Sequence, residues 1–269
     1  LADEPNDART DSLAFWAIHG WRKGMRKALR LTKPRQDILA TTGALGHVTR
    51  YLLAYAVGVE PPRRDYSLEE NLPRLEKHGL LRGKKWGKER VYWLPTYGTG
   101  RNPNIEHALE AGRVAVWLAR PAGLGHKAFI SRGTFVEAGL PVIPDAGVLL
   151  PFGDTRHLYL IEYQSRRESE RTTQNKVASY RLVVESIRVQ FSVDSVWVIF
   201  VLDLLRERVA EIAGRNCDGW PSFFFCDRLT LVSTNGNDLL HRAIFYWSGA
   251  TGTHSLVASD GSAAAGRTR

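Results

Sequence analysis

The apolar run SVWVIFVLDLL, residues 195–205, places the strongest limit on how this chain can fold. It is continuous rather than alternating and rich in β-branched residues, which is typical of a central strand buried on both faces. A helical pattern precedes it in ESERTTQNKVASYRLVVESI, and another follows it in RERVAEIAGR. With the segments upstream, the order is helix, strands, helix, strand, helix, strand. This order predicts an α/β or α+β sandwich around a mixed sheet.

Two apolar strands upstream are predicted to form a hairpin in PDAGVLLPFGDTRHLYLIEYQSR, residues 144–166. Gly at the first central position suits a two-residue type II′ turn. If Gly153 and Asp154 are the central residues, the pairing is symmetric about them, and Asp145 lies opposite Glu162. Like charges directly opposite each other destabilise a sheet unless something positive sits between them. The two acids are therefore either a metal-binding catalytic pair or two acids at the solvated end of a hairpin.

The remaining segments complete a second domain over residues 99–247. IEHALEAGRVAVWLAR is predicted to be a helix, and AFISR and TFVEAG are predicted to be strands before the hairpin. PSFFFCDRLTLVS is predicted to be the last strand. The tail, residues 248–269, lacks periodicity and is predicted to be disordered.

Residues 33–98 are predicted to form three helices and a two-stranded wing, the order of a winged helix-turn-helix domain. The helices are expected in RQDILATTGALGH, VTRYLLAYAVG and SLEENLPRLEKHGLL. The third has Ser67 as N-cap with Glu70 in a capping box and Gly79 as its stop, while Pro73 interrupts it or marks its true start. A basic turn and an apolar strand then form the wing.

The formal net charge of +9 favours a polyanionic partner, nucleic acid first and an anionic membrane surface second. Residues 33–98 hold 12 Lys and Arg against 7 Asp and Glu. The densest cations, which we predict to contact phosphates, lie in the wing: Arg82, Lys84, Lys85, Lys88 and Arg90. The third helix instead carries acids, Glu69, Glu70 and Glu76, which repel phosphate. A winged helix that docks a partner protein is therefore an alternative.

Residues 1–32 are predicted to be a polar tail followed by a basic amphipathic helix from Ser12 onward. Its cations are Arg22, Lys23, Arg26 and Lys27. Such a helix can bind DNA phosphates, lie on a membrane surface or be a solvated face. No apolar run approaches the roughly 20 residues that a membrane span needs. The chain has only two cysteines, which favours a reducing cytoplasm over a disulfide framework.

The acidic pair and the order of elements resemble the core of the PD-(D/E)XK nucleases, a restriction-endonuclease-like α/β sandwich. The resemblance implies that Asp145 and Glu162 hold Mg²⁺ or Mn²⁺ beside a scissile phosphate. The third position of the motif is usually Lys but is Gln164 here, which supplies no positive charge. Lys176 on the following helix could stabilise charge instead, with Gln164 positioning water or phosphate. Glu106 or Glu110 could add a further ligand.

The order of motifs from Lys33 to Ser233 also resembles the replication-relaxation family of plasmids and other bacterial mobile elements. The matching segments are LPRLEKHGLL with VYWLPTYG, IEHALEAGRVAVWLAR with His107, PDAGVLL, YLIEYQSRRES before the helix with Lys176 and Tyr180, and VWVIFVLD. The resemblance implies a winged helix followed by a nuclease-like domain that acts in replication, relaxation or mobilisation of DNA. Family members commonly carry an acid where this chain has Gln164.

We therefore expect a cytoplasmic DNA-binding protein of a mobile element, with protein partners in a replication or transfer complex. If it is an enzyme, the reaction is metal-dependent phosphodiester hydrolysis. Two alternatives stay open: a regulator or accessory factor that only binds DNA through a dead nuclease-like domain, and a module whose acidic third helix docks a protein.

Overall fold

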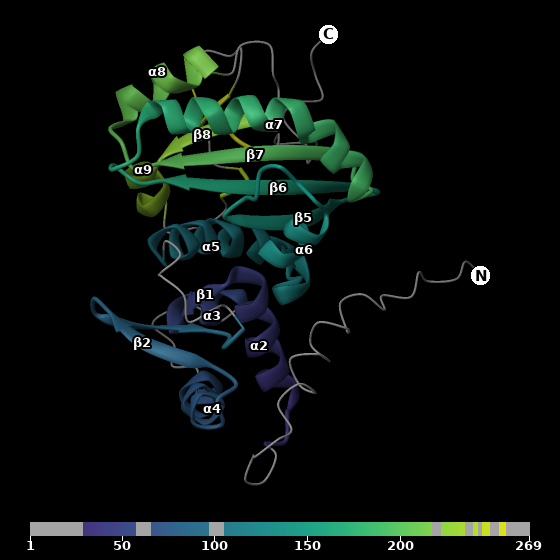
Figure 1. The fold of residues 1–269 in the computed structure, drawn as a ribbon, viewed down its shortest axis with the longest axis vertical. Coiled ribbons are helices and arrows are strands. Elements are labelled where there is room, and N and C mark those ends of the chain that lie inside the picture. The colour runs from purple at the N-terminus through teal and green to yellow at the C-terminus, as the bar shows by residue number, and fades with distance from the viewer. Residues whose placement is uncertain are drawn as a thin grey trace, which may run out of the picture.

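The computed structural model describes residues 29–57, 66–96, 105–216, 222–234, 239–241, 244–247 and 253–256. Figure 1 shows two stacked parts, a large sheet with its helices above and a smaller region below, with one helix lying between them. The chain is thus a mixed α/β protein with a large mixed sheet, as the order of segments predicted. None of the described helices is long and apolar enough to cross a membrane.

The large sheet has seven strands in the order β10-β9-β8-β7-β6-β5-β4. Its strands are β4 (Phe129–Ile130), β5 (Ala146–Phe152), β6 (Thr155–Gln164), β7 (Ser195–Leu202), β8 (Phe223–Asp227), β9 (Phe245–Trp247) and β10 (Thr253–His254). The pairs β6–β7 and β7–β8 are parallel, and the other pairs are antiparallel. The predicted central strand is β7, with its residues buried apart from the first.

Helices cover both faces of this sheet. One face packs on α5 (Ile105–Ala119), and the other packs on α7 (Glu170–Gln190) and α8 (Arg206–Asn216). Side chains of β6 alternate between these faces, because successive residues of a strand point to opposite sides. Tyr159, Ile161 and Tyr163 join the core on the α5 side, while Leu158 and Leu160 join the core on the α7 side. Glu162 therefore also points toward α7.

The smaller region contains α2 (Lys33–Leu45), β1 (His47–Thr49), α3 (Arg50–Ala56), α4 (Tyr66–Lys77), β2 (Arg82–Trp86) and β3 (Glu89–Trp93). Its three strands pair antiparallel in the order β1-β3-β2. The predicted two-stranded hairpin, β2–β3, is confirmed. Leu45, Val48 and Leu53 belong to the same apolar cluster as Val114 and Leu118 of α5, so the two parts share one continuous core.

Several short segments differ from their prediction because local side-chain bonds decide them. TFVEAG forms a helix, α6 (Arg132–Glu137), whose N-cap Ser131 accepts a bond from the amide of Thr134. The second half of PSFFFCDRLTLVS likewise forms α9 (Arg228–Ser233), capped by Asp227. Gly147 of β5 makes room for α6, since a Cβ there would lie 2.5 Å from the ring of Phe135.

Three further predictions are corrected. The first residues of VTRYLLAYAVG belong to β1 rather than to a helix, because His47–Thr49 pair with β3. Ser67 is not an N-cap: α4 begins at Tyr66 and continues through Pro73. Within the tail predicted to be disordered, Thr253 and His254 form β10 and pair with β9. The predicted basic helix with Arg22, Lys23, Arg26 and Lys27 lies outside the described residues.

Candidate functional site

The predicted hairpin register is confirmed. Phe152 pairs with Thr155 and Ala146 pairs with Ile161, so the pairing is symmetric about Gly153 and Asp154. Gly153 has a φ of +58°, the left-handed value that a type II′ turn requires at its first central position. The amide of Asp145, one residue before β5, donates to the carbonyl of Ile161 at 3.0 Å, so Asp145 and Ala146 both face Ile161, as in a β-bulge. Asp145 therefore lies beside Ile161 at the open end of the hairpin, just outside the paired register, and, contrary to the prediction, is not paired with Glu162.

Asp145 also bonds the neighbouring strand through its side chain. Its Oδ2 accepts a hydrogen bond of 3.0 Å from the amide of Tyr163. Among the described residues, Oδ1 makes no such bond. One oxygen of Asp145 is thus fixed to β6, and the other is available to a ligand.

Glu162 is fully buried and is held by two residues of α7. Its Oε1 accepts a hydrogen bond of 2.6 Å from the hydroxyl of Tyr180, and its Oε2 forms an ion pair with Lys176. Lys176 and Tyr180 are four residues apart, so they lie on the same face of the helix. The Glu162 side chain is 2% exposed, and that of Lys176 is 29% exposed. Lys176 therefore links a buried acid to the surface.

His107 of α5 lies between Asp145 and a further acid, Glu168. Its Nδ1 is 3.5 Å from Oδ2 of Asp145, and its Nε2 is 2.9 Å from Oε1 of Glu168. Its ring meets the ring of Tyr163 edge-on, with centroids 5.1 Å apart. We call His107, Asp145, Glu162, Glu168, Lys176 and Tyr180 the polar cluster. It joins α5, the β5–β6 hairpin and α7.

The pKa values in the polar cluster are shifted by burial and by neighbouring charges. Burial raises the pKa of Glu162 to about 7, and the negative charge of Asp145 adds to the rise, while Lys176 and Tyr180 oppose it. Burial opposes charge on Lys176, but Glu162 and Asp145 outweigh it and raise the pKa of Lys176. Burial likewise opposes charge on His107, and the hydrogen bond to Asp145 reverses the balance, so the pKa of His107 is raised.

The other predicted site residues are engaged elsewhere. Nε2 of Gln164 donates to the carbonyls of Glu168 (3.3 Å) and Ser169 (2.9 Å), so its amide holds the loop that leads into α7. Glu106 accepts a bond from the hydroxyl of Tyr163. Glu110 pairs with Arg113 and Arg228. Of the residues suggested to join the acidic pair, only Lys176 contacts it.

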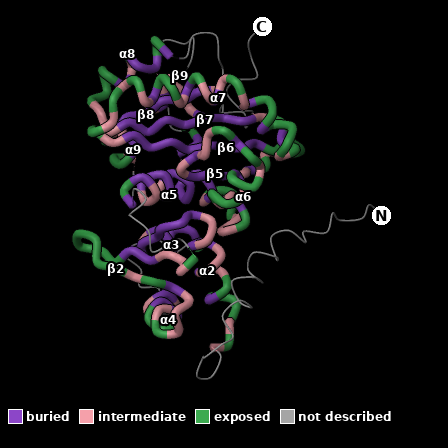
Figure 2. Tube along the Cα trace, in the orientation of Figure 1, coloured by how far each residue is buried: buried purple, intermediate pink, exposed green. Residues whose placement is uncertain are grey.

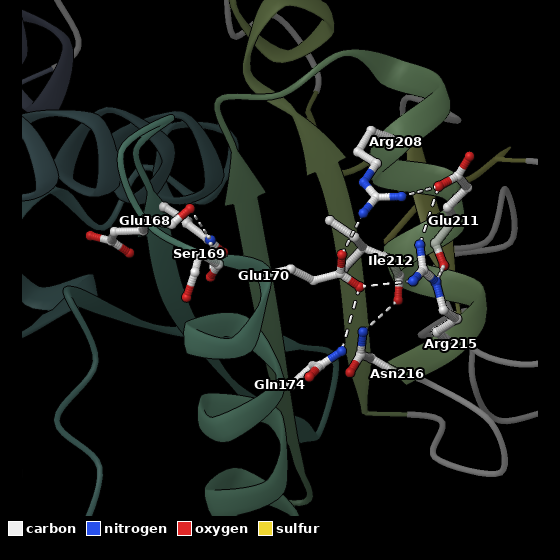
Figure 3. Close-up of polar contacts among 10 residues, drawn as sticks. Glu168, Ser169, Glu170, Gln174, Arg208, Glu211, Ile212, Arg215 and Asn216 are labelled. Carbon is white, nitrogen blue, oxygen red and sulfur yellow. Dashed lines mark hydrogen bonds and ion pairs between the residues drawn. The ribbon is translucent and has the colours of Figure 1, made fainter.

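The first turn of α7, which precedes Lys176, is tied to α8 by a charge network. Figure 3 shows Glu170 between two arginines of α8, with Arg208 at 2.6 Å and Arg215 at 3.2 Å. Both arginines also pair with Glu211. The network holds the start of α7 and so helps to position Lys176 and Tyr180, which lie about two and three turns further along.

The predicted phosphate-contacting cations lie on the β2–β3 hairpin, which we call the basic hairpin (Arg82–Trp93). Figure 2 shows its tip as exposed. Within the described part of the chain, Arg82, Lys84, Lys85 and Lys88 form no ion pair. Arg90 differs, because it pairs with Glu76 of α4. Trp86 at the tip is 42% exposed.

The acids of the third helix are each paired with an arginine. Glu76 pairs with Arg90, and the other two acids pair with Arg50 and Arg74. The negative charge of these acids is thus offset by neighbouring arginines. The positive charge of the lysines in the basic hairpin is not offset by an ion pair within the described residues. This arrangement weakens the expected repulsion of phosphate by α4.

Sequence reasoning assigned no role to Glu168, His107 or Tyr180. The spacing of Tyr180 from Lys176 was a usable signal, since residues four apart share a helix face. His107 was marked only by the family resemblance, and its contact with Glu168 spans 61 positions of sequence. No group of three or more His, Cys, Asp or Glu side chains in the described ranges is arranged to hold a metal.

In comparisons with known proteins, no family model, no curated protein and no solved structure matches the chain.

Proposed function

We propose that this chain is a DNA-binding protein whose larger part is a metal-dependent phosphodiesterase of the nuclease type. One observation carries the proposal: Asp145 and Glu162 meet at the open end of the β5–β6 hairpin, close enough for their charges to interact, and Lys176 reaches Glu162 from the next helix. Hydrolysis of a phosphodiester needs acids that hold a cation and a positive group near the phosphate. The polar cluster supplies both at one end of β6.

The donor set fits a hard divalent cation such as Mg²⁺ or Mn²⁺. Mg²⁺ is commonly held by one or two carboxylates together with substrate phosphates, rather than by a complete protein cage. Asp145 has one carboxylate oxygen without a hydrogen bond among the described residues, and Glu162 lies close enough for the two charges to interact. The raised pKa of Glu162 reflects in part the repulsion between these two carboxylates, which a cation would relieve. When bound, the ion would lower the pKa of a water molecule and stabilise charge on phosphoryl oxygens.

The residues around the acids have separate roles in this proposal. Lys176 donates to a phosphate oxygen, since its ammonium is partly exposed and its pKa is raised. Tyr180 holds Glu162 from α7, and His107 contacts Asp145 from α5. Gln164 fixes the loop that carries Glu168 and has no part in the chemistry.

The smaller region is proposed to grip DNA as a winged helix, with the basic hairpin as its wing. Two observations support this proposal: the order of the elements, and the exposed lysines of the basic hairpin, which form no ion pair within the described residues. The resemblance to the replication-relaxation family would set this activity in the replication, relaxation or mobilisation of plasmid DNA. Contacts to phosphates position a protein without reading bases.

A second candidate is a protein that binds DNA and cuts nothing. It is favoured by the state of Glu162, whose two oxygens already receive bonds from Lys176 and Tyr180. A buried acid that is satisfied in this way needs no ion, because buried polar groups require only hydrogen-bonding partners. The acidic pair would then be a structural element of the sheet.

Incubation of supercoiled plasmid with the protein and Mg²⁺ or Mn²⁺ decides between the candidates. We expect nicking, and we expect Asp145→Asn and Glu162→Gln each to abolish it while DNA binding is retained, since each change removes a charge but keeps side-chain shape. Asp154→Asn is the matched control, because Asp154 is an exposed acid at the turn, the opposite end of the same hairpin. No nicking by the unmodified protein and no rise of its melting temperature at millimolar Mg²⁺ or Mn²⁺ would leave the non-catalytic candidate.

A further inference from the structure

A cavity of about 350 Å³ lies where the smaller region meets the large sheet, away from the polar cluster. Its walls come from α2, the end of α3, the end of α5 and the short 3₁₀ turns Arg120–Ala122 and Gly125–Ala128. A volume of this size is at the lower end of small-molecule sites, which are often found between domains. The cavity therefore has the size and position of a ligand site.

The charges that line the cavity favour an anion. Lys33, Arg120 and Lys127 are permanent cations, and among the described lining residues Asp37 is the one acid, which leaves a formal charge of +2. Asp37 contacts Lys33 at 2.6 Å and Nδ1 of His126 at 3.5 Å. Burial lowers the pKa of His126, so this imidazole is neutral at pH 7 and can donate or accept a hydrogen bond.

A buried hydroxyl in the cavity wall has no hydrogen-bonding partner among the described residues. Thr41 of α2 is 1% exposed, and its Oγ1 makes no hydrogen bond within the described residues. An unpaired buried hydroxyl destabilises a protein by roughly 1–3 kcal/mol, so such groups are rare and call for an explanation. The next residue, Thr42, shows the usual solution, because its hydroxyl donates to the carbonyl of Ile38 at 2.7 Å. The oxygen is itself covered in the ligand-free protein, and rotation of the side chain about χ1 toward the cavity would bring it to a polar ligand.

The remaining walls suit an organic body of modest size. Val57, Val116, Leu124 and Phe129 are apolar, and the guanidinium of Arg120 lies 5.0 Å from the ring centre of Tyr55. A phosphate monoester carries a charge of about −1.5 to −2 at pH 7, which matches the +2 of the walls. We propose that this cavity binds a small phosphate monoester, of the size of a nucleoside monophosphate. Such a ligand would bridge α2 and α3 to α5 and so tie the smaller region to the large sheet.

Calorimetric titration of the full chain with adenosine monophosphate, ribose 5-phosphate and adenosine tests the proposal. Both phosphate esters should bind and raise the melting temperature, and adenosine should do neither, because the charge is the main determinant. Stronger binding of adenosine monophosphate identifies a nucleotide, while equal binding identifies a sugar phosphate. Lys127→Ala should weaken binding roughly tenfold, since one charge-assisted hydrogen bond is lost.

Two threonine variants separate binding from folding. Thr41→Val should weaken binding several-fold and leave the ligand-free protein as stable or more stable, because it removes an unpaired hydroxyl and keeps the shape. Thr42→Val is the matched control and should leave ligand affinity unchanged. The proposal is overturned if millimolar phosphate esters give neither heat nor a melting shift. It is also overturned if Lys127→Ala and Thr41→Val both bind like the unmodified protein.

Discussion

The basic hairpin and the polar cluster both contain several charged side chains, but those of the hairpin are exposed to solvent and those of the cluster are buried or partly buried. In the hairpin, Lys84, Lys85 and Lys88 are exposed and face no acid within the described residues. In the cluster, Glu162 is fully buried and every oxygen of its carboxylate has a donor. Exposed charges are screened by water and contribute little to stability, whereas a buried charge depends strongly on its partner. The same substitution should therefore alter binding in one region and folding in the other.

The largest effect is expected from Lys176→Met. Removing one partner of a buried ion pair leaves the other uncompensated, which typically destabilises a protein by about 3–5 kcal/mol. We expect a loss of about 4 kcal/mol in the free energy of unfolding at pH 8, measured by urea denaturation. Lys84→Met on the basic hairpin is the control and should change stability by less than about 0.5 kcal/mol. Equal losses in the two variants would remove the distinction between the regions.

The next effect is a dependence of stability on pH in metal-free protein. The pKa of Glu162 rises from 4.5 to about 7 on folding, so the folded state binds this proton more tightly than the unfolded state. The contribution of Glu162 is fully present below pH 4.5 and is lost as the pH rises through about 7, by about 3 kcal/mol in all. Melting curves from pH 4.5 to 8 measure it. Glu162→Gln should flatten this part of the profile, and an unchanged profile would contradict the assignment.

A smaller effect, on binding alone, is expected from replacing Lys84, Lys85 and Lys88 by Ala. DNA affinity should fall at least tenfold, or about 1.4 kcal/mol, for every sequence, and the salt slope should decrease by about 3. The matched control is Glu185→Ala with Arg188→Ala, which removes an exposed acid–base pair of α7 without a change in net charge. Gel-shift titrations at several salt concentrations compare the two. Unchanged affinity in the triple variant would favour a surface that docks protein.

Local chemistry allowed the hairpin to be predicted to the residue. The Gly153–Asp154 turn fixes the register from Phe152 and Thr155 to Ala146 and Ile161, since strand pairing is symmetric about the turn, whereas Asp145 lies just outside it. The buried strand β7 was equally predictable, because its apolar run has no polar face. In both cases the deciding interactions lie within a few residues of one another in the chain.

Other features depended on contacts that sequence patterns do not contain. TFVEAG was predicted as a strand, but the cap at Ser131 and the close fit of Phe135 over Gly147 make it helical. β1 forms only because His47–Thr49 pair with β3, more than 40 residues later. In the candidate site, the acidic pair and Lys176 were foreseen, whereas the contacts of His107 with Asp145 and Glu168 depend on how α5 packs on the sheet.

The continuous apolar core between the two parts has a consequence for how the chain folds. Leu45, Val48 and Leu53 pack in the same cluster as Val114 and Leu118, so neither part can lose its structure without exposing apolar surface of the other. Folding should thus be cooperative across the junction, with the smaller region and the sheet melting as one unit. A displacement at the tip of the basic hairpin would then be transmitted through packed side chains to α5, the helix that contains His107.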